Sequence, residues 1–306
     1  MVVLEPADLK ALRIAEVWGW FPEEAVLSPA GLDEAEYGRR LERLLQGGLI
    51  RSFHLTLVVP PLLGGNWVMA ALQVKSDDPH SLAEDIVSRL PFVTEIFINT
   101  SLPSGIGHSL ALIFYSRDFK NETRFIQNFS ATSEVEVFRV EEYTFPVSLP
   151  LSREERAFLQ FLYQNPTLPP GEIARSFGQS VNWVKAKISR LYWSRNNPAG
   201  VFRMQPSIDW SRCANFGHFH FLLETGHKPE MLEKMIAGQG FELVFWGRTG
   251  KRRYVEVESD VWGVADLLDR VSFLEKINGV RVAGVVHNRE TIINDRWVKN
   301  IVSLTG

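Results

Sequence analysis

The chain has 306 residues, of which 45% are hydrophobic and 23% are charged, and its formal net charge at pH 7 is −3. This balance excludes a basic field over the whole molecule, so any nucleic-acid binding must be local. Its single cysteine, Cys213, excludes an intrachain disulfide framework, and no apolar run approaches the ~18 residues of a spanning helix. Because the N-terminus also lacks a signal-like apolar core, we expect a soluble cytoplasmic protein.

The first segment of the chain has apolar residues at the spacing typical of helices. Residues 4–55 predict two helices separated by a turn at 28–31, with Asp33 as the N-cap of the second helix. The glycine pair at 47–48 ends that helix, and the alternating residues 49–59 predict a strand pair or wing.

From residue 66 the pattern becomes strand, helix, strand, strand, helix, strand. The predicted strands are 67–75, 93–100, 109–115 and 135–143, and the predicted helices are 81–90 and 121–129. This order is that of the ferredoxin-like unit, so we expect a four-stranded antiparallel sheet with two helices on one face.

The chain then repeats itself at an offset of 147 residues. Six positions, Leu4, Leu12, Gly31, Asp33, Leu41 and Leu44, recur as Leu151, Leu159, Gly178, Ser180, Ile188 and Leu191. Self-similarity of this kind predicts one two-part module present twice.

After a short proline-bearing link at 146–150, the second copy follows the same order. Its predicted helices are 153–164, 170–177, 181–194, 229–237 and 262–276; its wing is 200–206; its strands are 219–224, 241–246, 253–258 and 279–286. A short capping helix is expected around 294–302.

The predicted fold class is therefore α+β, with two winged helix-turn-helix domains alternating with two ferredoxin-like (βαββαβ) domains. The predicted boundaries are 1–62, 63–147, 148–212 and 213–306, the last domain carrying a C-terminal extension.

Four segments of the second copy resemble the winged helix-turn-helix of the Lrp/AsnC transcription regulators. They are LSREERAFLQFL at 151–162, EIARSFG at 172–178, VKAKISRL at 184–191 and GVFR at 200–203; RLERLLQGGLIR at 40–51 looks like the end of the same domain in the first copy. Both sheet regions resemble that family's ligand-binding (RAM) domain.

The resemblance implies a regulator that binds double-stranded DNA and senses a small molecule at the interface of its sheet domains. Family members usually carry one copy per chain and dimerise, so a tandem copy implies an intrachain pseudo-dimer. If one of the two winged helix-turn-helix domains in each chain binds DNA, recognition of a palindromic site would need a homodimer or larger assembly.

Charge distinguishes the two copies. Residues 151–205 hold eight Lys and Arg against three Asp and Glu, a net charge of +5, whereas residues 1–55 hold six against nine, a net charge of −3. Cations supply phosphate contacts, while Asn and Ser bond base edges or phosphates. The DNA-binding candidates are Ser180, Asn182, Lys185, Lys187, Ser189, Arg190, Arg195 and Arg203.

The acidic first copy is predicted to be a degenerate structural copy. Its second helix opens with three carboxylates, which would face phosphates. Weak backbone contact through Arg39, Arg40 and Arg43 stays open.

The effector candidates lie in the turns that match a family signature, Thr-Gly-x-x-Asp. Here those turns read TGKRR at 249–253 and SGIGH at 104–108, so a cation or histidine replaces the acid. The candidates are Arg248, Thr249, Gly250, Arg252, Arg253, Ser104, Gly105 and His108. A plain hairpin with a soluble tip is the alternative.

No cofactor, catalytic residue or metal site is predicted. His218 and His220 share one face of a predicted strand, which a metal could use, but core or interface histidines are the preferred interpretation.

Two alternatives to the regulator stay open. The siroheme decarboxylases share the two-half architecture and bind an acidic tetrapyrrole with His and Arg. In this chain His108, Arg248, Arg252 and Arg253 could take that role. The sequence Arg-Arg-Ile-Gly-Ala that tends to follow the wing in those enzymes is matched neither at 50–54 nor at 202–206. The other alternative is an effector-binding co-regulator without DNA binding. The sequence favours a regulator over an enzyme.

Overall fold

The computed structural model describes residues 1–90, 93–101, 108–128, 132–145, 151–194, 197–249 and 252–304, and divides into two compact units. The sheet unit comprises Val68–Glu142 and Asp209–Ile292, together with Met1. The helical unit comprises Val2–Trp67, Tyr143–Ile208 and Ile293–Gly306. Within the described part of the chain, every helix is too short or too polar to cross a membrane.

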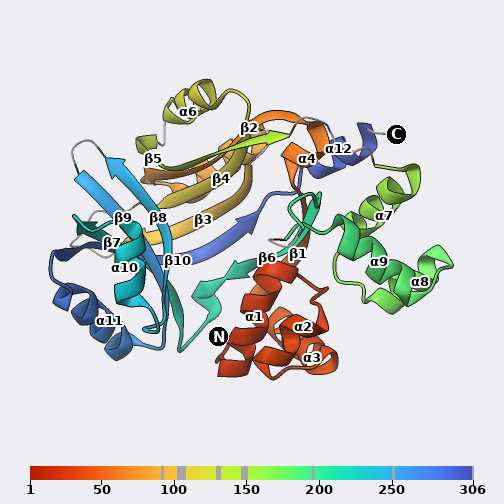
Figure 1. Ribbon diagram of the computed structural model, residues 1–306, viewed down its shortest axis with the longest axis horizontal. Helices are drawn as coiled ribbons and strands as arrows, with labels where there is room; N and C mark the ends of the chain where they lie inside the picture. Colours follow the sequence, from red (N-terminus) through yellow and green to blue (C-terminus); the bar gives the residue numbers. More distant parts are fainter. Residues whose placement is uncertain are drawn as a thin grey trace. The chain divides into compact units, whose positions relative to one another are not determined.

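The helical unit contains the duplicated helices (Figure 1). Its first copy holds α1 (Pro6–Trp18), α2 (Glu24–Leu27), η1 (Ser28–Ala30) and α3 (Glu34–Gln46); its second holds α7 (Arg153–Gln164), α8 (Pro170–Phe177) and α9 (Val181–Leu191). The starts of α1 and α7, and those of α3 and α9, are both 147 residues apart. The predicted repeat is thus present in the helices.

The same local signals begin and end these helices in both copies. A capping box opens α1 at Glu5 and α7 at Ser152. Gly31 and Gly178 lie in the left-handed region, with φ of 73° and 61°, just before α3 and α9. These signals are local in sequence, which is why the predicted bounds of α7 and α8 agree with the structure.

The strands that follow the two sets of helices pair with each other. Strand β1 (Ile50–Leu57) lies antiparallel to β6 (Phe202–Asp209), with Phe53 opposite Pro206. Of the strand pair or wing expected at 49–59, the structure shows one strand, which is followed by α4 (Val59–Leu63), where Pro60 and Pro61 lack the N–H groups that a second strand needs. The C-terminal helix α12 (Val298–Leu304) also begins later than expected.

The sheet unit contains one element order twice. The first half is β2 (Gly65–Ser76), α5 (Pro79–Arg89), β3 (Val93–Ser101), β4 (Leu110–Ser116), α6 (Phe119–Gln127) and β5 (Thr132–Phe145). The second half, preceded by η2 (Trp210–Arg212), is β7 (Gly217–Thr225), α10 (Pro229–Ile236), β8 (Phe241–Thr249), β9 (Arg252–Val261), α11 (Val264–Lys276) and β10 (Val280–Ile293). The strand order is β5-β2-β4-β3-β10-β7-β9-β8. The predicted order of elements is confirmed, although β10 runs to Ile293 rather than 286.

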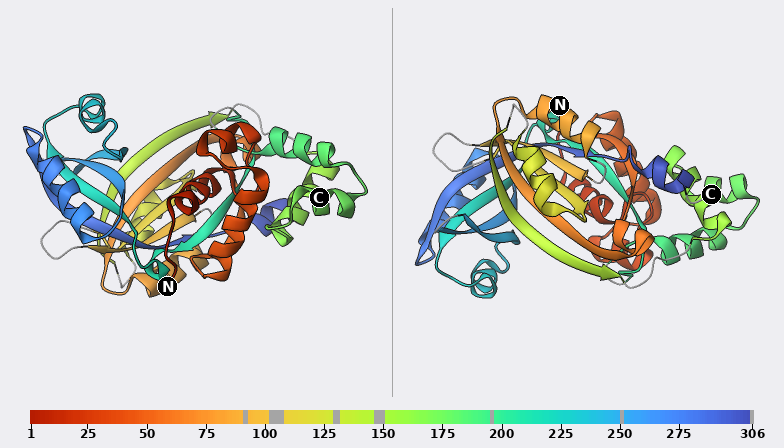
Figure 2. Two further views of the ribbon diagram at one scale, coloured as in Figure 1. Left: turned by 90° about the horizontal axis from the view of Figure 1, so that it is seen from below. Right: turned by 90° about the horizontal axis from the view of Figure 1, so that it is seen from above.

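Each half packs its helices on one face of its strands (Figures 1 and 2). Buried Leu232 and Ile236 of α10 and Leu274 of α11 pack against Phe221 of β7 and Val257 of β9. In the first half, α5 and α6 pack in the same way on β2, β3 and β4. The fold is therefore α+β with a large antiparallel sheet, and alternate residues of each strand are left for the opposite face. The four predicted domain boundaries stay predictions.

Candidate functional site

The opposite face of the second sheet half is lined with ionisable side chains. In the antiparallel pair β7–β9, His218 lies opposite Asp260, His220 opposite Glu258, and Leu222 opposite Glu256. Residues of even number on both strands share this face, because their odd-numbered neighbours enter the core with the helices. Histidines on one strand thus face carboxylates on the next.

The first sheet half carries apolar residues at the same positions. In the pair β2–β4, Met69 lies opposite Tyr115, Ala71 opposite Ile113, and Gln73 opposite Ala111. The two strand pairs correspond because β2 and β7 both end at a hydroxyl residue, Ser76 or Thr225, whose oxygen accepts a hydrogen bond from the N–H two residues later.

Met69, Ala71, Ile113 and Tyr115 are half-buried rather than sealed in the core. The positions of the first half that correspond to His218, His220, Glu258 and Asp260 are therefore Met69, Ala71, Ile113 and Tyr115, none of them an acid or a histidine.

A buried hydrogen-bond chain joins the two halves. Gln73 Nε2 donates to Glu256 Oε2 at 2.6 Å, and His220 Nδ1 lies 2.6 Å from Glu256 Oε1. Burial alone would raise the pKa of Glu256, but the hydrogen bond from His220, the electrostatic influence of the His220 and His108 rings and the hydrogen bond from Gln73 outweigh burial and lower it. Glu256 is thus a buried carboxylate whose ionised form is stabilised by its hydrogen-bond partners.

His218 lies between two carboxylates. Its Nδ1 is 3.0 Å from Asp260 Oδ1, and its Nε2 is 3.5 Å from Glu258 Oε2. Its ring stacks on Trp210 with centroids 5.9 Å apart and meets the His220 ring edge-on at 5.0 Å. These contacts on all sides fix the imidazole in one orientation.

His108, an effector candidate from the sequence, belongs to this cluster. It is buried just before β4, where burial lowers its pKa to about 4, against the opposing effect of Glu256 and with a smaller lowering by His220. The first half thus contributes Gln73 and His108 to a cluster otherwise built by the second.

The other effector candidates cannot be placed in this cluster. Ser104, Gly105 and Gly250 lie outside the described residues. Arg248 pairs with Arg253 and Thr249 with Arg252 across β8–β9, but their side chains lie outside the described part of the structure. Among the effector candidates the structure thus describes the side chain of His108, and the effector assignment stays a prediction.

Three of the DNA-binding candidates on α9 or at its N-cap are engaged within the helical unit. The Ser180 hydroxyl caps the helix by accepting from the Trp183 N–H at 3.2 Å. Lys187 Nζ pairs with Glu154 Oε1 at 2.7 Å, and Arg190 Nε lies 3.1 Å from Glu155 Oε1. Two of the five cationic candidates, Lys187 and Arg190, therefore pair with acids of α7.

Arg203 is also turned inward. Its Nη2 donates to the Glu16 carbonyl at 3.3 Å, and its guanidinium lies 5.4 Å from the centre of the Trp193 ring. Arg195 lies outside the described residues. The DNA-binding candidates left exposed on α9, apart from the paired Arg190, are Asn182, Lys185 and Ser189.

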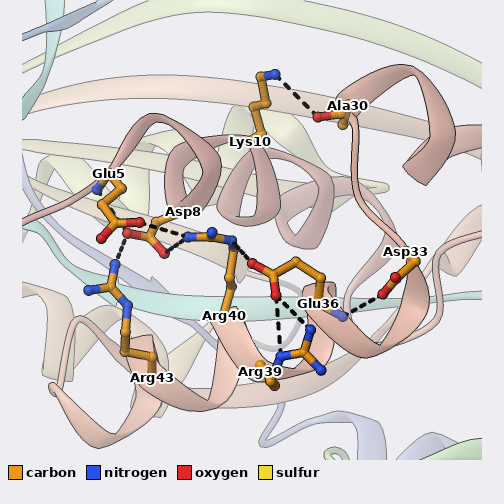
Figure 3. A network of polar contacts seen from close by, with 9 residues as sticks. All are labelled: Glu5, Asp8, Lys10, Ala30, Asp33, Glu36, Arg39, Arg40 and Arg43. Atoms are coloured by element: carbon orange, nitrogen blue, oxygen red, sulfur yellow. Dashed lines mark hydrogen bonds and ion pairs between the residues drawn. The ribbon is translucent and has the colours of Figure 1, made fainter.

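In the first copy, ion pairs also join the first helix to the third, and there are more of them (Figure 3). Buried Asp8 of α1 binds Arg40 Nη1 at 2.9 Å and also pairs with Arg43, both on α3. Arg40 additionally pairs with Glu5 and Glu36. At the offset of 147 residues, Asp8, Arg40 and Arg43 correspond to Glu155, Lys187 and Arg190, so each copy ties its first helix to its third through a buried acid.

Sequence reasoning missed four members of the cluster: Gln73, Glu256, Glu258 and Asp260. The available signal was the alternation of acids at 256, 258 and 260 opposite the alternating histidines of β7. It was not decisive, because the register that places these rows side by side is set by pairing far along the chain.

No protein-family model and no curated protein matches this chain. Among solved structures, the siroheme decarboxylase NirDL is similar with a TM-score of 0.47 and 17% identity, over 97% of this chain and 99% of that one. The same enzyme in complex with an iron-uroporphyrin III analogue gives 0.48 and 15%, over 98% and 100%. The E. coli regulator AsnC gives 0.28 and 18%, over 50% of this chain and 97% of that one.

Proposed function

We propose that the chain is an enzyme of the siroheme-decarboxylase type, which removes carboxyl groups from an acidic tetrapyrrole bound on the opposite face of the sheet unit. The observation that carries this proposal is that this face has half-buried apolar side chains at Met69, Ala71 and Ile113 of the first half and an imidazole cluster in the second, joined by the Gln73–Glu256 hydrogen bond. Titratable groups gathered in a buried place are typical of sites that move protons.

The polarity of the face suits such a substrate. A tetrapyrrole is a flat apolar disc edged by carboxylates. Met69, Ala71, Ile113 and Tyr115 offer a half-buried apolar floor for the disc. Because the carboxylates of the second half would repel an anionic edge, we assign the substrate carboxylates to the cationic turn that holds Arg248, Arg252 and Arg253.

The residues also suit the reaction. When an acetate side chain of the ring loses CO2, the electron pair of the broken C–C bond stays on the methylene carbon, which takes up a proton and becomes a methyl group. An imidazole is the usual donor for such a transfer at neutral pH. We assign the delivery of this proton to the site built around His220, whose ring is oriented by its hydrogen bond to Glu256, and a substrate-positioning role to His108.

In this account, the helical unit is scaffold. We propose that it contains two winged helix-turn-helix copies and that each sheet half is ferredoxin-like. Both third helices direct cations toward acids of their own copy, at Asp8 in the first and at Glu155 in the second. That use makes Lys187 and Arg190 less available to neutralise phosphates, which dominate DNA affinity.

A DNA-binding regulator of Lrp/AsnC type is the second candidate, because Asn182, Lys185 and Ser189 are exposed on α9. As a regulator, the chain would bind double-stranded DNA as a homodimer or larger assembly and sense its effector in the sheet unit. Lys185→Glu would then abolish a DNA affinity that falls steeply with salt.

The distinguishing experiment supplies siroheme to the purified protein and follows the tetrapyrrole by absorbance and mass spectrometry. The enzyme proposal predicts products lacking carboxyl groups, and a loss of at least about tenfold in rate for His220→Ala and His108→Ala. Unchanged siroheme, together with salt-sensitive DNA binding that Lys185→Glu removes, would favour the regulator.

A further inference from the structure

A potential set of metal ligands lies on the second half of the sheet unit. The ligand atoms of His218, His220 and Glu258 all lie within 4.8 Å of one another. The two histidines are two residues apart on β7 and so share a face, and Glu258 lies directly opposite His220 on β9. We infer that these three residues bind one divalent transition-metal ion, such as Zn2+ or Fe2+.

The surrounding carboxylates orient the ligands as a metal site requires. Metal-binding histidines usually hold the second ring nitrogen against a carboxylate, which fixes the ring and raises its basicity. Here Asp260 contacts Nδ1 of His218 at 3.0 Å, and Glu256 contacts Nδ1 of His220 at 2.6 Å. Both rings thereby present Nε2 as the coordinating nitrogen.

Charge on this patch also favours a cation. Three carboxylates, Glu256, Glu258 and Asp260, alternate along β9 and face two imidazoles. Glu256 is buried, and the side chains of Glu258 and Asp260 are 28% and 26% exposed. A divalent ion held by two neutral histidines would offset most of this negative charge in a region that water screens weakly.

The distances are close to those of a bound site. Ligand atoms that share an ion at about 2.1 Å are at most about 4.2 Å apart. His218 Nε2 and Glu258 Oε2, at 3.5 Å, already satisfy this limit. Small side-chain rotations would bring in His220. Two histidines and one carboxylate leave coordination positions for water or a small ligand, an arrangement typical of Zn2+ and non-haem Fe2+ sites.

The site occurs in one half of the duplicated sheet. The residues at the corresponding positions of the first half are Met69, Ala71 and Ile113, which cannot form a similar site. Within the described residues, the structure therefore assigns one such ion to the sheet unit.

The test titrates Co2+ into metal-free, tag-free protein and follows visible absorbance, with Zn2+ competition to confirm that both ions share the site. The expected result is one saturable equivalent per chain. His218→Ala and His220→Ala should abolish it, and Glu258→Gln should weaken it at least about tenfold. His80→Ala, which removes an exposed histidine of α5, is the matched control and should leave binding unchanged.

Circular dichroism of each variant separates loss of the site from loss of the fold. If the histidine variants unfold, the isosteric Glu258→Gln and Asp260→Asn decide, with at least about tenfold weaker Co2+ binding expected for both. Absence of saturable binding, or equal binding by wild type and Glu258→Gln, would overturn the assignment. Because no tetrapyrrole is present, the result is independent of the proposed decarboxylase activity.

Discussion

Gln73 and Glu256, 183 residues apart in the sequence, share a buried hydrogen bond of 2.6 Å that joins the two halves of the sheet unit. Glu256 also accepts from His220. Glu256→Ala would leave both partners without their buried acceptor, so we expect a loss of about 3–5 kcal/mol in the free energy of unfolding, measured in urea.

Gln73→Ala tests the same bond from its neutral side and should cost about 1–3 kcal/mol. The control is Glu233→Ala on α10, an exposed acid whose removal should change stability by less than about 0.5 kcal/mol. Equal effects at Glu256 and Glu233 would show that the cross-half bond does not stabilise the fold.

The buried acid of α1 gives a second prediction. Asp8 is fully buried and binds Arg40 and Arg43, so Asp8→Ala leaves two cations without their shared partner. We expect a loss of about 3–5 kcal/mol by urea denaturation. Arg39→Ala breaks an exposed pair with Glu36 and should cost no more than about 1 kcal/mol. Comparable losses in both variants would contradict this description of the network.

The equivalent acid in the second copy predicts a pH dependence. Burial opposes ionisation of Glu155, but hydrogen bonds from Ser152 and the charges of Arg190 and Lys187 outweigh burial and hold its pKa below the ordinary value of 4.5. A carboxyl group with a lowered pKa stabilises the fold fully above that ordinary value, and its contribution is lost as the pH falls through the folded-state pKa.

Wild type should therefore lose more stability than Glu155→Gln when the pH falls from neutral to about 3. Urea unfolding at several pH values measures this difference. Parallel pH profiles for the two proteins would show that Glu155 does not contribute.

Two glycines with positive φ should respond differently to alanine. At Gly19, with φ of 56°, a Cβ would lie 2.3 Å from Met204 Cβ, whereas at Gly31, with φ of 73°, it would meet nothing within 4 Å. Gly31→Ala should cost about 1 kcal/mol through the backbone alone. Gly19→Ala adds the clash and should cost about 3 kcal/mol. Thermal or urea unfolding of the pair tests whether β6 approaches Gly19 this closely.

How far the sequence predicted the fold depended on how local each signal was. The bounds of α7 agree with the prediction because Ser152 and Glu155 form a capping box within one turn. The pairing of β1 with β6 was not predicted, since it joins segments some 150 residues apart, such as Phe53 and Pro206.

The candidate site shows the same limit. His218 and His220 could be placed on one strand face from their spacing. Their carboxylate partners required the register of β9, and Gln73 required the two halves to meet. The pairing of Lys187 with Glu154 depends on how α7 packs against α9, which a helix-by-helix pattern does not contain.

The measurement that tests the central proposal most directly is the mass of siroheme after incubation with the purified chain under reducing, oxygen-free conditions. The account predicts conversion to products that have lost carboxyl groups, at a rate that falls at least about tenfold in His220→Ala while an exposed-histidine variant, His80→Ala, keeps full activity. Siroheme recovered intact, or converted equally well by His220→Ala, would contradict it.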